Sequence, residues 1–249
     1  MATERVVAVV EARMGSSRLP GKSMRPLAGA PLVQRVVERL RRASTIDDIV
    51  LATTVEARDD VLADHFHRCG VNVFRGSEDD VLLRILGAAQ SREATVHVQC
   101  WGDCPFLEPT EVDRTVTALL ESDDDLVGNG LAKERTLPYG LDVIALRVSA
   151  LLRAEELTRE SRYHREHGTT FIYQTPNLFR ARGLETPADL RYPAFNATIN
   201  TEDDYTFVAS IYEALLPRNP SFGIRDVMAF IRSRPDLLAH PNASALASP

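Results

Sequence analysis

The sequence predicts an α/β fold with a largely parallel central sheet that helices cover on both faces. Short β-branched runs alternate with amphipathic segments over residues 5–120 in the order βαβαβαβα. Such alternation is typical of parallel strands joined by helical crossovers. The length of 249 residues suits one large domain of this class.

The elements of the first half follow from local patterns. A β-branched run, residues 5–10, predicts a strand that leads into a loop containing Gly, Ser and Pro. From Pro31 to Leu40 apolar residues recur at helical spacing, and a proline suits the first helical turn. The next predicted elements are strand 49–52, helix 61–66, strand 71–74, helix 78–89, strand 95–99 and a helix beginning near Thr110.

The second half is less regular. We expect residues 129–170 to form an extension that includes a hairpin and one or two polar helices. A strand at 179–184 and helices at 203–215 and 224–232 follow. Residues 241–249 are small and polar, which predicts a flexible tail. Because no repeat or linker divides the chain, we predict one domain over residues 1–240, followed by that tail.

Charge and composition exclude several classes of protein. The chain has 35 acidic and 29 basic side chains and a formal net charge of −6, which argues against binding nucleic acid by neutralising many phosphates. No apolar run approaches the roughly 18 to 20 residues of a transmembrane helix. Cys69, Cys100 and Cys104 contain no CxxC pair, so neither a disulfide framework nor a zinc site is indicated. We therefore expect a cytoplasmic protein that binds neither nucleic acid nor a membrane.

Positive charge is concentrated in the segment after the first strand. Residues 12–37 hold five basic side chains and no acidic one, namely Arg13, Arg18, Lys22, Arg25 and Arg35. This segment leaves the carboxyl edge of a parallel sheet, where open α/β folds bind ligands. Gly15 and Gly21 allow close backbone approach, and Ser16 and Ser17 add donors, so the loop predicts a polyphosphate site. It has neither P-loop spacing nor a GxGxxG fingerprint.

The same segment resembles a known family. The residues Glu11-Ala-Arg-Met-Gly-Ser-Ser-Arg-Leu-Pro-Gly-Lys22, with Leu27-Ala-Gly-Ala-Pro-Leu32, are similar to the opening motif of the CMP-sugar synthetases. The nearest branch is the spore-coat polysaccharide cytidylyltransferases, related to the CMP-keto-deoxy-octulosonate and acylneuraminate synthetases. Further matches follow in order: Phe74-Arg-Gly-Ser-Glu-Asp-Asp-Val-Leu82 with Arg84, Gly102-Asp-Cys-Pro105, Tyr139-Gly-Leu-Asp-Val143 and Arg165-Glu-His167.

The resemblance implies a Rossmann-like nucleotide-diphospho-sugar transferase fold, a homodimer paired through the extension, and Mg²⁺-dependent transfer of CMP from CTP with release of pyrophosphate. The implied catalytic residues are Arg13, Lys22 and Asp103, with the cations on phosphate oxygens and Asp103 on the metal. The implied nucleotide site comprises Ala12, Arg13, Gly15, Ser16, Arg18, Lys22, Thr53, Ser77, Asp80, Gln99 and Gly102. The implied acceptor site comprises Tyr139, Asp142, Arg165, His167 and Asn196.

Three positions depart from the family pattern. Asn200 stands where an aspartate completes the metal site, Asn196 where arginine is frequent, and Ile144 where glutamate is frequent. We keep Asn200 beside Asp103 as a candidate metal ligand and expect weaker metal binding, because an amide oxygen carries no charge. All three departures lie in the half implied to bind the acceptor.

Several functions stay open on the sequence alone. The acceptor is predicted to be a small anion, a sugar acid or a phosphonate, because nearby cations would recognise its charge. A nucleotide-binding relative with lapsed catalysis is an alternative, given Asn200. A glycosyltransferase is another, because Asp123-Asp-Asp125 is formally an Asp-x-Asp motif, although it follows a helix rather than a buried strand.

Overall fold

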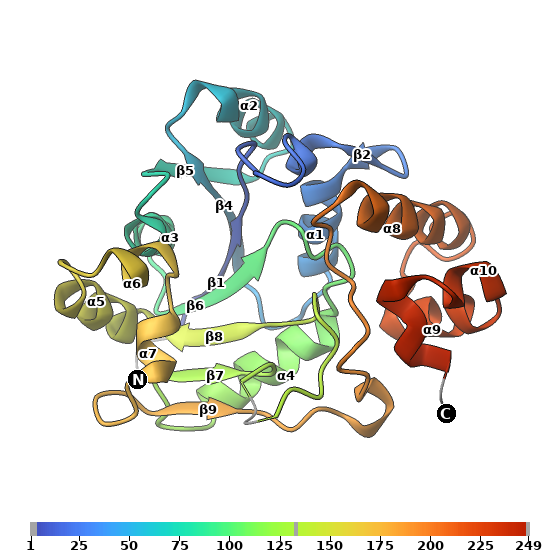
Figure 1. Ribbon diagram of the computed structural model, residues 1–249. Helices are drawn as coiled ribbons and strands as arrows, with labels where there is room; N and C mark the ends of the chain where they lie inside the picture. Colours follow the sequence, from blue (N-terminus) through green and yellow to red (C-terminus); the bar gives the residue numbers. More distant parts are fainter. Residues whose placement is uncertain (1–3, 132–133, 248–249) are drawn as a thin grey trace.

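A seven-stranded sheet lies at the centre of the protein (Figure 1). The computed structural model describes residues 4–131 and 134–247. The strand order is β5-β4-β1-β6-β8-β7-β9. These strands are β1 (Val6–Glu11), β4 (Asp48–Thr54), β5 (Asn72–Gly76), β6 (Val96–Trp101), β7 (Leu126–Gly128), β8 (Ile144–Arg147) and β9 (Ala181–Gly183). A separate small hairpin pairs β2 (Pro26–Leu27) with β3 (Ala30–Pro31).

The sheet is mostly parallel, which confirms the predicted fold class. β5, β4, β1 and β6 pair in parallel, and so do β7 and β9. Only β8, among the described strands of this sheet, runs antiparallel to its neighbours β6 and β7. The sequence placed residues 144–147 in an extension, whereas they form an inner strand of the sheet.

Helices cover both faces of the sheet, as expected. They are α1 (Leu32–Leu40), α2 (Asp60–Arg68), α3 (Val81–Gln90), α4 (Pro109–Leu120), α5 (Val148–Leu157), α6 (Arg162–Glu166), α7 (Thr170–Gln174), α8 (Glu202–Leu215), α9 (Ile224–Arg232) and α10 (Pro235–Leu238). Side chains of β1 alternate between two cores: Val6, Ala8 and Val10 pack with α1, α2 and α4, while Val7 and Val9 pack with α3, α5 and α7. Across the described residues, no helix is long and apolar enough to cross a membrane.

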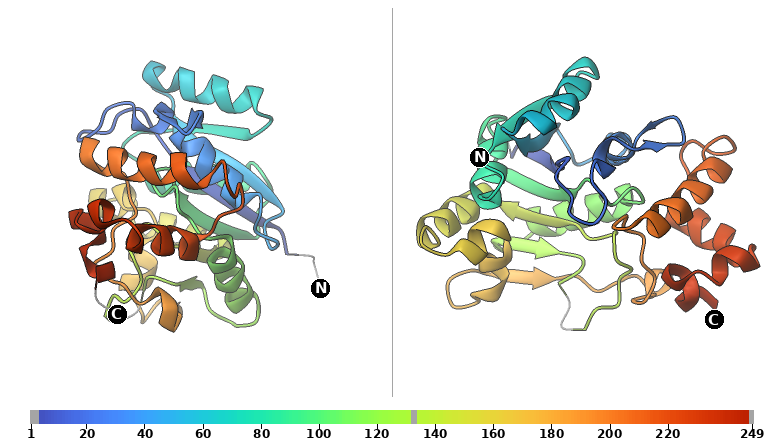
Figure 2. Two further views of the ribbon diagram at one scale, coloured as in Figure 1. Left: turned by 90° about the vertical axis from the view of Figure 1, so that its right-hand side faces the viewer. Right: turned by 45° about the horizontal axis from the view of Figure 1, so that its top comes forward.

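The carboxyl-terminal helices form a third core beside α1. Figures 1 and 2 show α8, α9 and α10 gathered there with the final segment. Residues 241–247, for which we expected a flexible tail, form the 3₁₀ helix η4 (Pro241–Ala247). Ala243 and Leu246 are buried in this core, and Asn242 Nδ2 donates to Asp204 Oδ1 at 2.7 Å. The apolar side chains of this segment therefore pack against the folded domain.

Candidate active site

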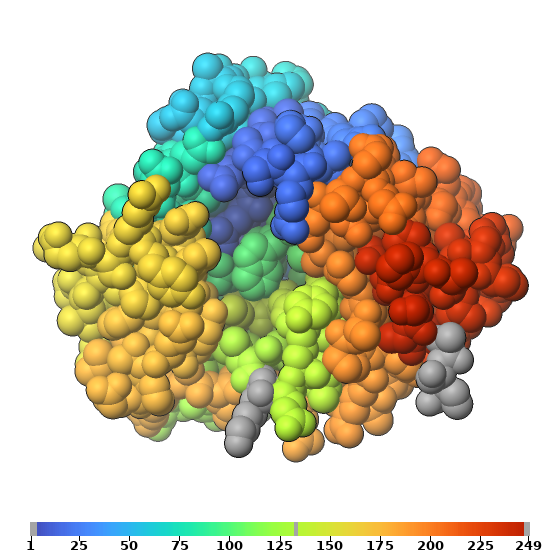
Figure 3. All heavy atoms as spheres, viewed as in Figure 1, coloured from blue at the N-terminus to red at the C-terminus, as the bar shows by residue number. Residues whose placement is uncertain are grey.

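A cavity of ≈ 330 Å³ opens where β1 and β6 end. Figure 3 shows a hollow bordered by the blue loop after β1, the yellow region of α6 and the orange segment that leads into α8. The cavity is lined by Glu11, Ala12, Arg13, Ser16, Ser17, Arg18, Lys22, Ser23, Val81, Arg84, Trp101, Gly102, Asp103, Glu166 and Asn200. We call it the loop cavity, because the segment after β1 supplies most of its wall.

Backbone anchors hold that loop in place. Met14 N donates to Asp59 Oδ1 at 2.6 Å, and the Met14 carbonyl accepts from Gly21 N at 2.9 Å. Gly21 has a φ of 74°, a left-handed conformation that favours glycine. Ser23 Oγ donates to the Arg13 carbonyl at 3.0 Å. The cationic side chains therefore project from a loop whose path is fixed at several points.

Lys22 meets two oxygen-bearing side chains from distant segments. Its Nζ donates to Asp103 Oδ2 at 2.7 Å, to the Ile199 carbonyl at 2.7 Å and to Asn200 Oδ1 at 3.4 Å. Arg18 also donates to Asn200 Oδ1, at 2.7 Å. The structure thus brings the predicted residues Arg18, Lys22, Asp103 and Asn200 together at one wall of the loop cavity.

Close packing places Asp103 at this wall. A Cβ on Gly102 would lie 2.8 Å from the Ala12 Cβ and 3.0 Å from the Glu11 carbonyl. A larger residue at position 102 would therefore push the end of β6 away from the end of β1. The same glycine lines the cavity with Ala12, and both are predicted nucleotide residues.

Arg13 faces the cavity from its other side. Its guanidinium contacts Glu78 Oε1 at 3.2 Å, and Glu78 also pairs with Arg58. A Cβ on Gly15 would lie 3.0 Å from the same Glu78 oxygen, so the loop passes close to this acid without Gly15 itself lining the cavity. An entering polyanion would compete with Glu78 for Arg13.

The oxygen atoms of Asp103 and Asn200 fit Mg²⁺, which prefers hard oxygen ligands and is often bound by one or two protein side chains with substrate phosphates. Both oxygens lie within 3.4 Å of the same Lys22 nitrogen. Among the described residues, no group of three or more His, Cys, Asp or Glu side chains is placed to hold a metal ion. Ligand oxygens would therefore have to complete the coordination.

Two charged residues at the floor of the cavity escaped the sequence prediction. Burial raises the pKa of Glu11, whose Oε1 accepts from Gln99 Nε2 at 2.6 Å. Arg84 is 5% exposed and lines the cavity, and burial lowers its pKa. Its Nε has no partner among the described residues. Both residues lie within the quoted motifs, but their positions in those motifs gave no indication of a role.

Besides Gly15, four predicted nucleotide residues do not line the cavity. Thr53 is buried in β4, and Gln99 lies behind Glu11, where its Oε1 accepts from Thr169 Oγ1 at 2.7 Å. Asp80 caps α3 by accepting from Leu83 N at 2.9 Å, and Ser77 Oγ accepts from Asp80 N at 3.1 Å. These residues shape the walls from behind.

A second cavity of ≈ 370 Å³ adjoins the first, and Trp101 and Asp103 line both. We call it the aromatic cavity. Its lining comprises Trp101, Asp103, Cys104, Gly130, Leu131, Arg135, Tyr139, Gly140, Asp142, Ile144, Tyr173 and Thr198. The two nitrogens of the Arg135 fork donate to the two Asp142 oxygens, each at 2.8 Å. The predicted acceptor residues Tyr139 and Asp142 therefore lie directly beside Asp103.

The other three predicted acceptor residues lie elsewhere. Arg165 pairs with Asp80 and with Glu155 Oε1, the latter at 2.9 Å, and so ties α6 to α3 and α5. His167 lines a different pocket with Arg13. Asn196 Oδ1 accepts from Thr198 N at 3.0 Å and from Thr198 Oγ1 at 2.7 Å. None of the three lines the aromatic cavity in the part of the chain that the structure describes.

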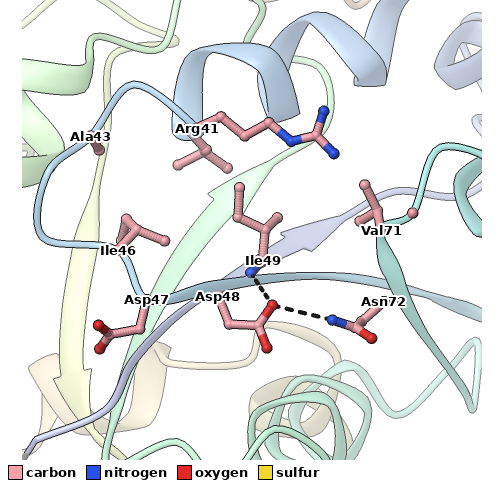
Figure 4. A pocket seen from close by; sticks show the side chains of 10 residues that line it. Arg41, Ala43, Ile46, Asp47, Asp48, Ile49, Val71 and Asn72 are labelled. Atoms are coloured by element: carbon pink, nitrogen blue, oxygen red, sulfur yellow. Dashed lines mark hydrogen bonds between the residues drawn. The ribbon is translucent and has the colours of Figure 1, made fainter.

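The opposite edge of the sheet carries structural acids. Figure 4 shows a pocket where β4 and β5 begin. There Asp48 Oδ1 accepts from Ile49 N at 2.8 Å and from Asn72 Nδ2 at 3.1 Å, and Asp48 Oδ2 accepts from Arg92 Nε at 2.8 Å. This carboxylate is satisfied by the fold itself.

The Asp-x-Asp motif also lies at that edge, just before β7. Asp124 Oδ2 accepts from Arg182 Nε at 2.6 Å, and Asp125 Oδ2 accepts from Arg180 N at 2.8 Å. The motif is therefore at the wrong edge of the sheet to complete the loop cavity. The glycosyltransferase alternative loses the feature that suggested it.

A cationic loop and an acid at the carboxyl edge of a mostly parallel sheet are suited to bind the phosphates of a nucleotide and place the protein in the nucleotide-binding class of α/β proteins. Comparison with known families shows to which family of such proteins the chain belongs. The sequence profile of the cytidylyltransferases matches residues 7–225, and the chain belongs to that family. It is a CTP-dependent nucleotidyltransferase that transfers CMP.

Relatives resemble the chain over nearly its whole length. An uncharacterised protein of Methanocaldococcus jannaschii is 31% identical over 94% of this chain and 93% of its own length. The spore coat polysaccharide biosynthesis protein SpsF of Bacillus subtilis is 29% identical over 93% of this chain and 95% of its own. A solved cytidylyltransferase from Leptospira borgpetersenii superposes with a TM-score of 0.84 at 27% identity, covering 94% of this chain and 97% of that one.

Proposed function

We propose that the protein transfers CMP from CTP to a hydroxyl of a small-molecule acceptor, with release of pyrophosphate and dependence on Mg²⁺. One observation carries this proposal: Trp101 and Asp103 line both cavities. A nucleotide in the loop cavity and an acceptor in the aromatic cavity would meet at Asp103. Alignment of two reactants in this way is a large part of phosphoryl-transfer catalysis.

The loop cations supply the electrostatic part of the reaction. Arg13, Arg18 and Lys22 face the cavity with donors now held by Glu78, Asn200 and Asp103. Phosphate oxygens of CTP would take over these donors on binding. The acceptor oxygen forms a bond to the α-phosphorus, the bond from that phosphorus to the bridging oxygen breaks, and the hydroxyl proton passes to solvent. The cations then neutralise the charge that develops on the leaving pyrophosphate.

Asp103 and Asn200 would hold Mg²⁺ with phosphate oxygens. When bound, the ion supplies positive charge beside the reacting phosphate. Lys22 contacts both side chains in this structure, so the lysine must give up part of this contact when the metal and the nucleotide enter. Lys22 thereby keeps Asp103 neutralised until the substrate arrives.

The anionic acceptor predicted from the sequence rested partly on Arg165 and His167. Neither lines the aromatic cavity, and the charge of Arg165 is matched by Asp80 and Glu155. We therefore propose CMP transfer without requiring a charged acceptor. A homodimer paired through residues 129–170 and a cytoplasmic location stay predictions, to be checked by light scattering and by cell fractionation.

Turnover with different nucleotides tests the proposed function. The protein is incubated with each nucleoside triphosphate, Mg²⁺ and a panel of small acceptors, and pyrophosphate is measured. We expect pyrophosphate with CTP, and only when Mg²⁺ is present. Tight CTP binding without pyrophosphate from any acceptor would instead support a nucleotide-binding relative whose catalysis has lapsed.

A further inference from the structure

We propose that the acceptor is an uncharged molecule of the neutral sugar class, with several hydroxyls and one apolar face, rather than a sugar acid or a phosphonate. This inference rests on the proposed function and on the chemistry of the aromatic cavity. The cavity adjoins the loop cavity at Asp103 and Trp101, so whatever it holds lies next to the reacting phosphate.

The charges that line the aromatic cavity do not suit an anion. The charged residues among the described lining are Arg135, Asp103 and Asp142. Arg135 pairs with Asp142, and Asp103 pairs with Lys22 of the loop cavity, so each of these charges is already matched. The single cation is already occupied, because its guanidinium donates to both Asp142 oxygens and to the Pro138 carbonyl at 2.9 Å. A carboxylate or phosphonate entering the cavity would therefore find no unpaired cation among these residues to offset its charge.

The pairing of Arg135 with Asp142 is built into the local backbone. A Cβ on Gly130 would lie 2.1 Å from Asp142 Oδ1, so only glycine leaves room for this carboxylate. The Arg135 guanidinium also stacks 3.8 Å from the centroid of the Tyr139 ring. Ion pair and stacking together hold Arg135 against the wall, where it supports the aromatic ring instead of offering a free charge.

The remaining walls suit the face of a sugar ring. Trp101, Tyr139 and Tyr173 present aromatic groups, while Leu131 and Ile144 present aliphatic ones. Tyr139 is 50% exposed although its ring is large and apolar. Aromatic side chains combine an apolar surface with a polar tip, and sites for small molecules are mostly apolar with a few orienting polar groups. A neutral ring with C–H bonds on one face and hydroxyls at its edge matches both properties.

Two neutral side chains agree with this assignment. Ile144 contributes an apolar surface to the cavity. The side-chain oxygen of Asn196 accepts from Thr198, and Asn196 itself lies outside the cavity lining.

Matched pairs of acceptors test the inference. Pyrophosphate release from CTP with Mg²⁺ is measured for glucose against glucuronate, for glucitol against gluconate, and for a hydroxyalkyl phosphonate against its alcohol. We expect at least one neutral member to react about tenfold faster than its acidic partner, as one unpaired buried charge is enough to produce. The inference is overturned if the acidic members react faster than their neutral partners. It is also overturned if no neutral member reacts although CTP still binds. Pyrophosphate from acids alone would leave the proposed function standing, whereas failure to bind CTP would refute that function itself.

Variants separate charge from shape. Asp142→Asn leaves Arg135 without its partner, so acidic acceptors should gain about tenfold relative to neutral ones. Tyr139→Ala should raise the acceptor KM about tenfold with the CTP KM unchanged, while Tyr139→Phe stays within a few-fold. A further variant, Lys133→Met, tests whether this lysine, which lies outside the described residues, supplies a cation for acidic acceptors. An unaltered preference in Asp142→Asn, or acid turnover that depends on Lys133, contradicts the inference.

Discussion

A buried histidine on β6 makes the stability of this protein sensitive to acid. His97 is fully buried, and neither ring nitrogen has a hydrogen-bond partner among the described residues. It pairs in the sheet with Val7 and with Leu146. Burial lowers the pKa of His97 to about 3, from an ordinary value of 6.5. The folded protein therefore keeps this ring neutral where the unfolded chain would protonate it.

The sign and size of the effect follow from proton linkage. Stability from His97 is complete well above pH 6.5, because neither state then binds the proton. As pH falls, the unfolded state gains a proton that the folded state refuses down to about pH 3. The expected loss for His97 alone is about 2 kcal/mol at pH 5 relative to pH 8, and about 4 kcal/mol by pH 3.

Urea unfolding of His97→Leu measures this contribution. The fluorescence of Trp101, the single tryptophan of the chain, reports unfolding at pH 8 and pH 5. The leucine variant should lose about 2 kcal/mol less than the wild type between these values, and should be more stable at pH 8 by about 1–3 kcal/mol, because two orphaned polar atoms are removed. His67→Leu, on the exposed end of α2, is the control and should keep the wild-type pH dependence. An identical pH dependence in His97→Leu and the wild type would refute the reasoning.

Three other variants test separate parts of the structure. Lys22→Met should reduce pyrophosphate release from CTP by roughly 100-fold with an unchanged circular dichroism spectrum, because a positioned charge on the phosphates is lost; near-normal rates would remove Lys22 from the site. Asn200→Asp should lower the Mg²⁺ concentration for half-maximal rate by about tenfold, since a carboxylate binds Mg²⁺ better than an amide oxygen; an unchanged magnesium titration would place Asn200 away from the metal. Leu246→Ala should lower the free energy of unfolding in urea by about 2–4 kcal/mol, and no change would mean that η4 contributes nothing to the core.

Local patterns predicted most of the fold. The helix at 32–40 and the strand at 96–101 have periodicity or β-branched runs that depend only on neighbouring residues. The place of β8 could not be predicted in this way. Its four residues pair with Val96–Gln99 on one side, and three of them pair with Leu126–Gly128 on the other. Such long-range pairing leaves no periodic pattern in so short a segment.

The candidate site likewise contains residues that a local motif predicts and residues whose surroundings depend on the folded structure. The cationic loop is continuous in sequence, so its motif predicted Arg13, Arg18 and Lys22 together, and all three line the loop cavity. Arg165 was assigned to the acceptor by resemblance, but its partners Asp80 and Glu155 come from other elements. A charge that is matched only after folding cannot be distinguished in sequence from a charge that is free to bind a ligand. The 3₁₀ helix η4 could not be predicted for a related reason, because the burial of Leu246 depends on α9 being in place.

The measurement that tests the central claim most directly compares the wild type with Asp103→Asn. Pyrophosphate release from CTP is followed with Mg²⁺ and the acceptor that the wild type uses fastest, and CTP binding is measured by calorimetry. We expect the variant to fold and to lose roughly 100-fold or more in turnover, because Asp103 is the carboxylate shared by the two cavities. The control variant is Thr110→Ala, which changes an exposed side chain at the start of α4 and should retain wild-type turnover. Wild-type turnover in Asp103→Asn would contradict the assignment of this site.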